Sequence, residues 1–295
     1  MSLTLHGIFP PMLTPFDARG DIDEGAFIRN IERWNRANLS GYVVLGSNSE
    51  AVYLAEKEKL QLIELALDHA AGGRSVIAGT GLESTRETIA LTNLAASLGA
   101  QAALVITPSF YGGHMTEEAL VHHFTSIADE SKIPILLYNV PKFTHINLTP
   151  EVVQKLSEHS NIVGMKDSKG DVTQLEQYAR AAKPGFQVVV GTASVILAGL
   201  KLGCRTSISA LANVLPNECA QLMTLYEQGK ETEAERLQMK LIPLNSAVTQ
   251  TYGVAGLKYA ASLRGYEGGE VRSPLLPLSE QERVEIRKLL AAFAA

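Results

Sequence analysis

The sequence lacks the features on which secreted and membrane proteins depend. Its 295 residues include only two cysteines, Cys204 and Cys219, which are too few for a disulfide framework and are not spaced as C-x-x-C. Its composition does not suit a membrane span. The N-terminus MSLTLHGIFPPM has neither a basic region followed by a long apolar stretch nor an Arg-rich presequence. We therefore expect a cytoplasmic protein without a membrane partner.

An excess of charge of one sign is also missing. The chain has 26 Lys and Arg against 31 Asp and Glu, a net charge of -5, so a basic surface for nucleic acid is not expected. The metal signals are weak, because His122 and His123 are adjacent on one helix pattern and point in different directions, and Asp21-Ile22-Asp23 lacks the rest of a calcium loop. Small molecules are the expected partners, with no metal and no cofactor.

What the sequence does contain is a regular alternation of short apolar runs with longer helical patterns. The runs are GIFPPML, GYVVLG, SVIAGT, AALVIT, PILLYN, NIVGMK, FQVVVG and TSISA. They are continuously apolar, as expected for parallel strands covered by helices on both faces. Eight such units predict an α/β fold, a (β/α)8 TIM barrel over residues 1–228. A doubly wound sheet is disfavoured, since GTGLES is only a fragment of a glycine fingerprint.

Residues 229–295 are expected to form a helical extension packed on the barrel. Three helical patterns occur there, ETEAERLQMKLIPLNSAV, GVAGLKYAASL and SEQERVEIRKLLAAF. We expect these helices to be interrupted at Pro243, at Gly253 and at the SPLLP stretch.

In a barrel the catalytic side chains gather where the strands end, and the sixth strand ends on Lys166. The simple interpretation is a solvated lysine at a strand end. The functional one is an amine that attacks a ketone, which requires the neutral form that burial favours. A nearby Asp167 carboxylate would oppose this, but successive strand residues point to opposite faces, so Asp167 is expected to face away.

Two further strand ends carry polar groups that converge on the same mouth. Tyr138 ends the fifth strand and is either a proton shuttle or a core tyrosine with a satisfied hydroxyl. The turn GSNSE after the second strand offers backbone N-H groups to a carboxylate or phosphate, or is an ordinary helix-capping turn.

Three motifs together resemble the dihydrodipicolinate synthase / N-acetylneuraminate lyase family of Schiff-base aldolases. They are Gly46-Ser47-Asn48-x-Glu50, Tyr138-Asn139-Val140-Pro141 and Gly164-Met165-Lys166-Asp167-Ser168. The likeness spans nearly the whole chain. Pro-Pro-x-x-Thr-Pro-Phe near the start, and Ala-Leu-Ala-Asn-Val and Asn-x-Ala-Val-Thr later, look most like the 4-hydroxy-2-oxoglutarate aldolase branch.

The resemblance implies a role for each matching residue. Lys166 would be the Schiff-base lysine, Tyr138 the proton-shuttling phenol and Ser47 the relay hydroxyl beside it. Asn48 and the turn amides would hold the carboxylate of pyruvate. Tyr111 would reach a neighbouring subunit's site in a homotetramer built from tight dimers, although the extra residue in TPSFYGG makes Phe110 a rival alignment.

The substrate's far end would meet other residues at the strand ends. Ser168 follows the branch and is expected near the distal carboxylate or hydroxyl, and Lys142 and Gly191 are also expected to bind substrate. Gly191-Thr192-Ala193-Ser194 also suits a phosphate-binding barrel, but that stretch has no basic residue.

The chain departs from the family pattern at two positions. Ser49 stands where glycine is usual, and a serine there would be strained if the turn required a positive φ. Phe143 stands where synthases that use aspartate semialdehyde carry an arginine, and a phenyl ring cannot make a bidentate carboxylate pair. Lys142 compensates in part.

The expected function is therefore a class I aldolase that cleaves 4-hydroxy-2-oxoglutarate to pyruvate and glyoxylate, with a covalent Schiff base on Lys166 and no other cofactor. The alternatives are dihydrodipicolinate synthase and an aldolase for 2-keto-3-deoxy sugar acids. A keto-acid-binding barrel without turnover is a further alternative from another functional class.

Overall fold

The computed structural model describes residues 4–293, and its centre is a single parallel sheet of eight strands in the order β1-β8-β7-β6-β5-β4-β3-β2. The strands are β1 (Gly7–Ile8), β2 (Gly41–Val44), β3 (Ser75–Gly79), β4 (Ala102–Ile106), β5 (Ile135–Asn139), β6 (Ile162–Asp167), β7 (Gln187–Val190) and β8 (Thr206–Ser207). A parallel bridge between Pro11 and Val43 joins the first segment to β2 and closes the barrel. The predicted TIM barrel is confirmed.

β1 is shorter than its apolar run because two prolines follow it. Pro10 and Pro11 have no backbone N-H to donate to a neighbouring strand. Pairing therefore continues only through single bonds, with the Phe9 amide donating to the Ser207 carbonyl and the Met12 amide to the Val43 carbonyl.

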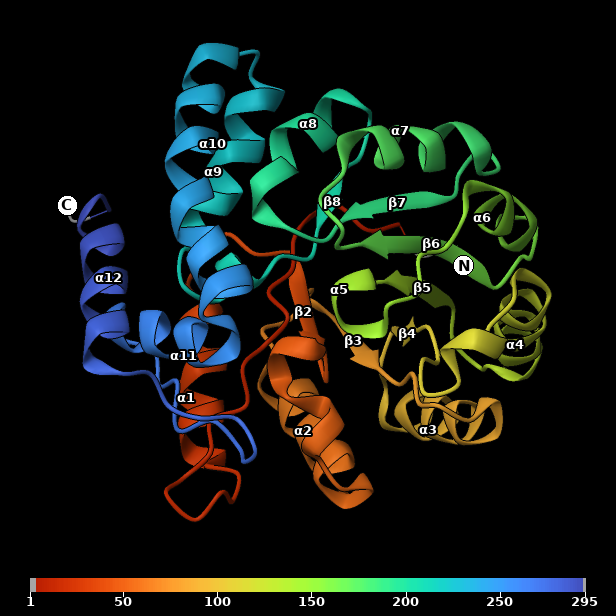
Figure 1. The fold of residues 1–295 in the computed structure, drawn as a ribbon, viewed down its shortest axis with the longest axis horizontal. Helices are drawn as coiled ribbons and strands as arrows, with labels where there is room; N and C mark the ends of the chain where they lie inside the picture. Colours follow the sequence, from red (N-terminus) through yellow and green to blue (C-terminus); the bar gives the residue numbers. More distant parts are fainter. Residues whose placement is uncertain (1–3, 294–295) are drawn as a thin grey trace.

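Helices after the strands surround the sheet (Figure 1). They are α1 (Glu24–Trp34), α2 (Glu56–His69), α3 (Thr85–Leu98), α4 (Glu117–Glu130), α6 (Pro150–Ser157), α7 (Val172–Ala181), α8 (Ile196–Lys201) and α9 (Pro216–Glu227), with a single turn α5 (Pro141–Thr144) directly after β5. Several begin at a side chain that accepts a hydrogen bond from the first turn, as Asp23 does for α1 and Thr149 for α6.

Short turns fill the loops at the strand ends. They are η1 (Ser47–Ser49), η2 (Ala51–Tyr53), η3 (Gly112–His114), η4 (Ala193–Val195) and η5 (Ala210–Asn213). Of these turns, only the one at GSNSE was predicted from the sequence. These turns matter because they set the positions of the side chains at the mouth of the barrel.

The core has two parts because strand side chains alternate between the faces of the sheet. One cluster fills the barrel interior, and its buried members are Leu5, Phe9, Val43, Ile77, Ala102, Leu104, Leu136, Tyr138, Val140, Val189 and Ile208. The larger cluster lies between the sheet and the helices, with Trp34 and Phe124 among its fully buried members. A side chain's position in the strand therefore decides whether it faces the barrel interior or the helices.

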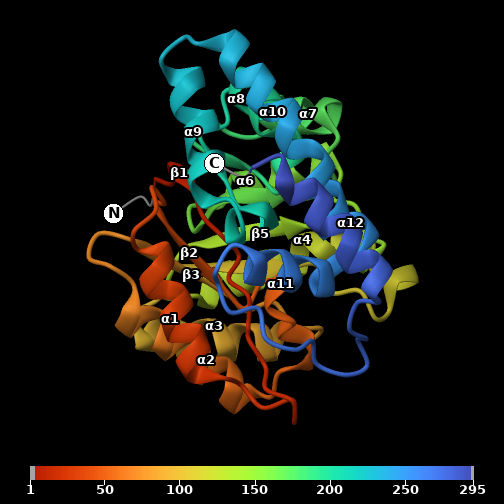
Figure 2. The same cartoon turned by 90° about the vertical axis from the view of Figure 1, so that its left-hand side faces the viewer.

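Three helices and a π-helical turn follow the barrel: α10 (Glu231–Ser246), η6 (Ala247–Thr251), α11 (Gly253–Leu263) and α12 (Glu280–Ala291). Figures 1 and 2 show them together on one side of the barrel, next to α1 and α9. α10 packs along α9, and α11 packs against α12. The separation into residues 1–228 and 229–295 as two units stays a prediction.

The expected break at Pro243 is wrong. Pro243 lies inside α10, which continues to Ser246. The proline ring leaves the carbonyl of Met239 without its helical hydrogen-bond donor, and both Met239 and Pro243 are exposed, so the proline lies on the outer side of the helix. The expected interruption at Gly253 is present, because η6 ends at Thr251 and Gly253, with a φ of +55°, begins α11. Among residues 4–293, no helix combines the length and the apolar character needed to cross a membrane.

Candidate active site

Lys166 and Tyr138 lie side by side inside the barrel. They are register partners on the neighbouring strands β6 and β5. Both side chains are buried, with 2% and 4% of their surface exposed. The Lys166 Nζ lies 4.2 Å from the centroid of the Tyr138 ring. The two strand ends therefore bring an amine and a phenol into contact.

A serine hydroxyl completes this cluster. The Ser47 Oγ lies 3.1 Å from the Tyr138 hydroxyl, and either group is able to donate. Burial by itself would raise the pKa of Tyr138, but the charge of Lys166 and hydrogen bonds from neighbouring side chains outweigh burial and hold the pKa below its ordinary value. The hydrogen-bonding neighbours are Ser47, Ser168 and Lys166. A phenol in such a setting gives up its proton more readily than a free tyrosine.

Asp167 faces away from Lys166, as the alternation along the strand predicts. Its Oδ1 accepts hydrogen bonds from Asn139 Nδ2 at 2.7 Å and from Gln174 Nε2 of α7 at 3.4 Å. Burial raises the pKa of this carboxyl group. Asn139 and Asp167 are also register partners, so their bond on the outer face holds the strand alignment that pairs Tyr138 with Lys166 on the inner face.

Ser168 and Gly191 meet where β6 and β7 end. The Ser168 hydroxyl donates to the Gly191 carbonyl at 3.3 Å, and the Gly191 amide donates to the Asp167 carbonyl at 2.7 Å. A Cβ at position 191 would lie 2.3 Å from the Ser168 Oγ and 2.4 Å from the Asp167 carbonyl oxygen. Only glycine, which has no Cβ, allows the backbone at position 191 to come this close to Ser168 and Asp167. Gly191 therefore allows Ser168 to stay close to Tyr138.

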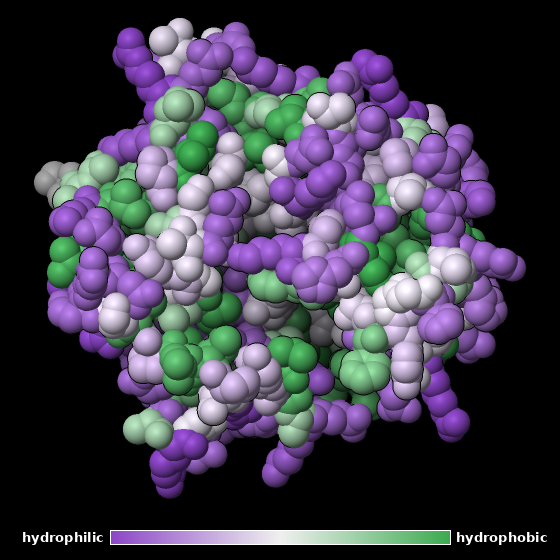
Figure 3. All heavy atoms as spheres, viewed as in Figure 1, coloured by the Kyte–Doolittle hydropathy of each residue, from purple (hydrophilic) through white to green (hydrophobic). Residues whose placement is uncertain are grey.

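A cavity of about 600 Å³ opens beside this cluster. Of the predicted residues, Ser47, Tyr138 and Lys142 line it together with Phe143, and Lys166 adjoins it through the ring of Tyr138. The face shown in Figure 3 is hollowed near its centre, with hydrophobic and hydrophilic side chains around the hollow. Such a mixed lining suits a small organic acid, which has both an apolar chain and charged ends.

Lys142 and Phe143 lie on the rim of the cavity. The Lys142 ammonium group donates to the carbonyl of Thr249 in η6 and lies 5.4 Å from the centroid of the Phe143 ring. Burial lowers the pKa of Lys142. Phe143 is 52% exposed. The rim therefore has one amine, that of Lys142, and an exposed phenyl ring at position 143. An arginine at position 143 would instead present a planar cation.

Tyr111 does not join the cluster within one chain. Its side chain is 68% exposed, and its ring packs edge-on against Phe110, which is 77% exposed. The loop is fixed by Glu83, which accepts the amides of Ser109 and Phe110 at 2.8 and 2.9 Å. The loop thus presents two aromatic rings outward from the barrel.

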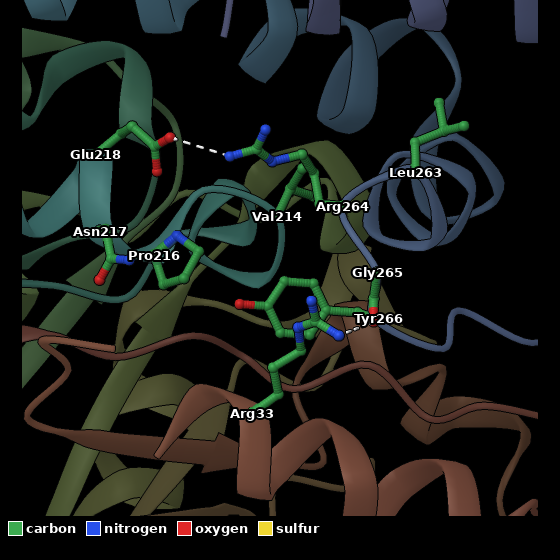
Figure 4. A pocket seen from close by; sticks show the side chains of 9 residues that line it. All are labelled: Arg33, Val214, Pro216, Asn217, Glu218, Leu263, Arg264, Gly265 and Tyr266. Atoms are coloured by element: carbon green, nitrogen blue, oxygen red, sulfur yellow. Dashed lines mark hydrogen bonds and ion pairs between the residues drawn. The ribbon is translucent and has the colours of Figure 1, made fainter. Parts of the chain in front are cut away.

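A second hollow, of about 400 Å³, lies between the end of α1, the start of α9 and the end of α11 (Figure 4). The Arg33 guanidinium donates to the Gly265 carbonyl there, and Arg264 pairs with Glu218 at 3.4 Å. Both arginine side chains of this hollow thus have a partner within the chain. The residues predicted for catalysis lie elsewhere. Among residues 4–293, no group of three or more His, Cys, Asp or Glu side chains is arranged to hold a metal ion.

Comparison with known proteins shows which family the chain belongs to. Residues 4–293 match the profile of the "Dihydrodipicolinate synthetase family". A relative from Methanothrix thermoacetophila, named 4-hydroxy-tetrahydrodipicolinate synthase, is 37% identical over 98% of this chain and 97% of its own length. The chain belongs to the dihydrodipicolinate synthetase family. The resemblance to this family that the motifs indicated is therefore confirmed.

Solved structures of family members have the same fold. Dihydrodipicolinate synthase DapA-2 from Bacillus anthracis has a TM-score of 0.94 at 28% identity, covering 99% of this chain and 100% of its own. The chloride-inhibited synthase from Acinetobacter baumannii, solved with pyruvate, has a TM-score of 0.93 at 31% identity, covering 98% of this chain and 99% of its own. Membership places the chain among pyruvate-dependent class I aldolases, which are carbon-carbon lyases.

Ser49, which departs from the glycine usual in the dihydrodipicolinate synthetase family, is accommodated without strain. It ends η1 in a helical conformation, and the residue with positive φ is the next one, Glu50, at +55°. The Ser49 hydroxyl donates to the Met12 carbonyl at 2.5 Å, and the Ser49 carbonyl accepts from the Thr14 hydroxyl at 2.9 Å. The side chain thus anchors the turn to the first segment of the barrel.

A buried lysine that was not predicted from the sequence lies close to this turn. Lys258 of α11 forms an ion pair with Glu50 at 2.5 Å, and both side chains are about 2% exposed or less. The available signal was a single charge within the apolar stretch GVAGLKYAASL of a family member. Fully buried lysines are rare unless they are paired, so this one indicated a partner elsewhere in the chain.

Proposed function

We propose that this family member is a lyase that cleaves a 4-hydroxy-2-keto acid, 4-hydroxy-2-oxoglutarate, to pyruvate and glyoxylate. The observation that carries the proposal is the cluster of Lys166, Tyr138 and Ser47 beside a cavity whose rim has Phe143 instead of an arginine. The cluster supplies the covalent chemistry. The rim affects which substrate binds, because Phe143 takes the place of an arginine that would bind a carboxylate.

In the proposed reaction the Lys166 amine attacks the C2 carbonyl, water leaves, and an iminium forms that withdraws electrons from C3. Tyr138 takes the proton of the 4-hydroxyl group, the C3-C4 bond breaks, and glyoxylate departs. The resulting enamine takes a proton at C3, and water then releases pyruvate from Lys166. Ser47 relays the proton, which agrees with its 3.1 Å contact to Tyr138.

Other residues are proposed to hold the substrate. Asn48 and the amides of its turn would bind the carboxylate next to the keto group, which is the end of the molecule that pyruvate retains. Ser168, Lys142 and Gly191 would border the far end. The contact of Ser168 with Gly191 and the position of Lys142 on the cavity rim support this assignment.

The synthase reaction, in which pyruvate condenses with aspartate semialdehyde, is the second candidate. The relatives' names favour it, since the chain is 37% identical to a protein named as a synthase. Phe143 disfavours it, because a phenyl ring cannot grip the carboxylate of the semialdehyde as a bidentate arginine does. Direct comparison of the two reactions on one protein preparation separates the candidates.

In that comparison the purified chain is expected to cleave 4-hydroxy-2-oxoglutarate with a higher kcat/KM than it shows for aspartate semialdehyde condensation or for 2-keto-3-deoxy sugar acids. Phe143→Arg is expected to raise kcat/KM for the semialdehyde by roughly tenfold or more, because a charged hydrogen bond contributes about 1.5–3 kcal/mol. Phe143→Leu serves as the control and should give no gain. Faster condensation than cleavage by the wild type would instead identify a synthase.

We also propose a homotetramer built from dimers in which Tyr111 completes the neighbouring subunit's site. The exposed Tyr111 and Phe110 rings support this arrangement, since two aromatic side chains on one loop are otherwise left in solvent.

Mixing two defective chains tests this arrangement. Lys166→Met and Tyr111→Phe are each expected to have low activity, while mixed oligomers should recover activity, because one site then combines an intact Lys166 with an intact Tyr111 from the other chain. The rival alignment places Phe110 instead of Tyr111 at the neighbouring subunit's site. A parallel mixture with Phe110→Leu in place of Tyr111→Phe is therefore the matched control. Absence of recovery with Tyr111→Phe, together with a monomeric mass in solution, would contradict the proposal.

A further inference from the structure

The ion pair between Glu50 and Lys258 lies in the protein interior, directly behind the turn proposed to bind pyruvate. The Lys258 Nζ is 2.5 Å from the Glu50 Oε1, donates to the Glu270 carbonyl, and lies 4.5 Å from the centroid of the Phe16 ring. Its three hydrogens therefore meet a carboxylate, a carbonyl and an aromatic face. The pair connects α11 to the loop that follows β2.

Arg272, in the segment after α11, holds the same loop at two further points. Its backbone amide donates to the Glu50 Oε2 at 2.8 Å, and its guanidinium donates to the Tyr53 carbonyl at 3.0 Å. The guanidinium also pairs with both carboxylate oxygens of Glu58 in the first turn of α2. Lys258 and Arg272 together therefore fix Glu50, which precedes the turn η2, and Tyr53, which ends it.

Glu50 needs this support because its backbone has a left-handed conformation, with a φ of +55°. Residues other than glycine pay for that conformation with strain and adopt it only where their surroundings determine it. The Glu50 amide meanwhile donates to the Ser47 carbonyl at 3.3 Å and closes η1. The Ser47 carbonyl shares a peptide plane with the Asn48 amide, so the conformation of Glu50 is coupled to the orientation of the Asn48 amide.

Stability does not explain the ion pair. Replacing a buried pair with apolar side chains of similar volume is often neutral or stabilising. Burial also lowers the pKa of Lys258 to about 8, against an ordinary value of 10.5. Between these values the unfolded chain holds a proton that the folded chain has lost, so stability rises with pH there. Charging Lys258 near neutral pH therefore costs folding free energy.

We propose that Glu50, Lys258 and Arg272 are positioning residues that hold the turn Ser47–Ser49 in the geometry that binds the carboxylate of pyruvate. Lys258 and Arg272, which do not line the cavity, would thereby influence substrate binding without touching substrate. This inference rests on the proposed function, in which that turn binds the keto acid. The turn held by these three residues binds the carboxylate equally in the ground state and in the transition state. Loss of their contacts should therefore raise KM and leave kcat largely unchanged.

The test uses the full-length double variant Glu50→Gln/Lys258→Met, which removes both charges and keeps the side-chain volumes similar. Borohydride trapping of pyruvate on Lys166 is measured over a range of pyruvate concentrations, beside the thermal unfolding midpoint. The half-saturating pyruvate concentration should rise by roughly tenfold or more, the scale of a misplaced hydrogen bond to a charged group. The trapping rate at saturation and the unfolding midpoint should stay close to the wild type. Glu280→Gln/Arg287→Met, which removes an exposed pair on α12, is the control and should change none of these.

An unchanged half-saturating pyruvate concentration in a folded double variant would overturn the inference. A lower thermal unfolding midpoint, with fewer sites that trap pyruvate but with unchanged affinity at those sites, would also overturn it. If the double variant does not fold, Arg272→Lys replaces it, because lysine keeps the charge and loses the bidentate grip on Glu58. That variant should raise the half-saturating concentration about threefold, on the order of a weak hydrogen bond, and no rise would overturn the inference. Failure of the wild type itself to trap pyruvate would instead reject the proposed function.

Discussion

Lys166→Met is expected to abolish the borohydride-stable adduct that the wild-type chain forms with pyruvate, and to lower cleavage activity by roughly 10⁴-fold to 10⁶-fold, the scale seen when a covalent nucleophile is removed. The physical reason is that the buried Lys166 amine beside Tyr138 is the group positioned to form the iminium. Intact mass after reduction, followed by peptide mapping, measures the adduct and locates it.

Lys169→Met is the matched control for this experiment. Lys169 lies three residues further along the chain, is partly exposed, and pairs with Asp171 at 3.2 Å. Its removal should leave the adduct and the activity intact. Methionine is close to lysine in length and apolar, so the buried position 166 should tolerate it and the variant should remain folded. An adduct of undiminished yield on Lys166→Met would show that another amine is the nucleophile and would end the assignment.

Tyr138→Phe is expected to separate the binding of pyruvate from the chemistry. Without the phenol, the 4-hydroxyl proton has no acceptor, and kcat for cleavage should fall by about 10²-fold to 10⁴-fold, the contribution usual for a positioned acid or base. The ring remains, so Lys166 keeps its aromatic neighbour and pyruvate should still be trapped by borohydride. Steady-state kinetics and intact mass, run in parallel, provide the two readouts.

The pH dependence gives an independent check on Tyr138. Its pKa is held below the ordinary value of 10, chiefly because the charge of Lys166 overcomes the effect of burial. A shuttle must be protonated at one step and deprotonated at another. As the pH is raised, the wild-type kcat should therefore begin to fall before pH 10 is reached, where Tyr138 loses its proton. Tyr138→Phe should lack this alkaline decline. Tyr259→Phe, which removes an exposed hydroxyl on α11, is the control. Retention of full kcat in Tyr138→Phe would remove the phenol from the mechanism.

Much of the barrel was predictable because its strands carry a local signal. An apolar run such as ILLY or IVGM identifies a strand covered on both faces, and eight such runs in alternation with helices leave few other folds. Pro243 shows the limit of local rules. Proline breaks helices by removing one hydrogen bond and by steric contact, yet packing of α10 against α9 outweighs that loss and carries the helix through.

The turn after β2 illustrates a different limit. From the sequence, Ser49 was the residue of concern because glycine is usual there. In the structure the left-handed backbone falls on Glu50, and Ser49 is anchored by Met12 and Thr14. A sequence pattern identifies which residues form a turn. It does not identify which of them takes the strained conformation, since that depends on contacts with distant segments.

The sequence by itself determined the strands, the family and the residues at the strand ends, because periodicity and motif order are local properties of the chain. Tertiary structure decided which of those residues touch. The register of β5 against β6 places Lys166 beside Tyr138, and packing of α11 under the turn brings Lys258 to Glu50. Such contacts depend on the alignment of strands and on helix packing, which are set by the free energy of the whole core and leave little trace in any short stretch of sequence.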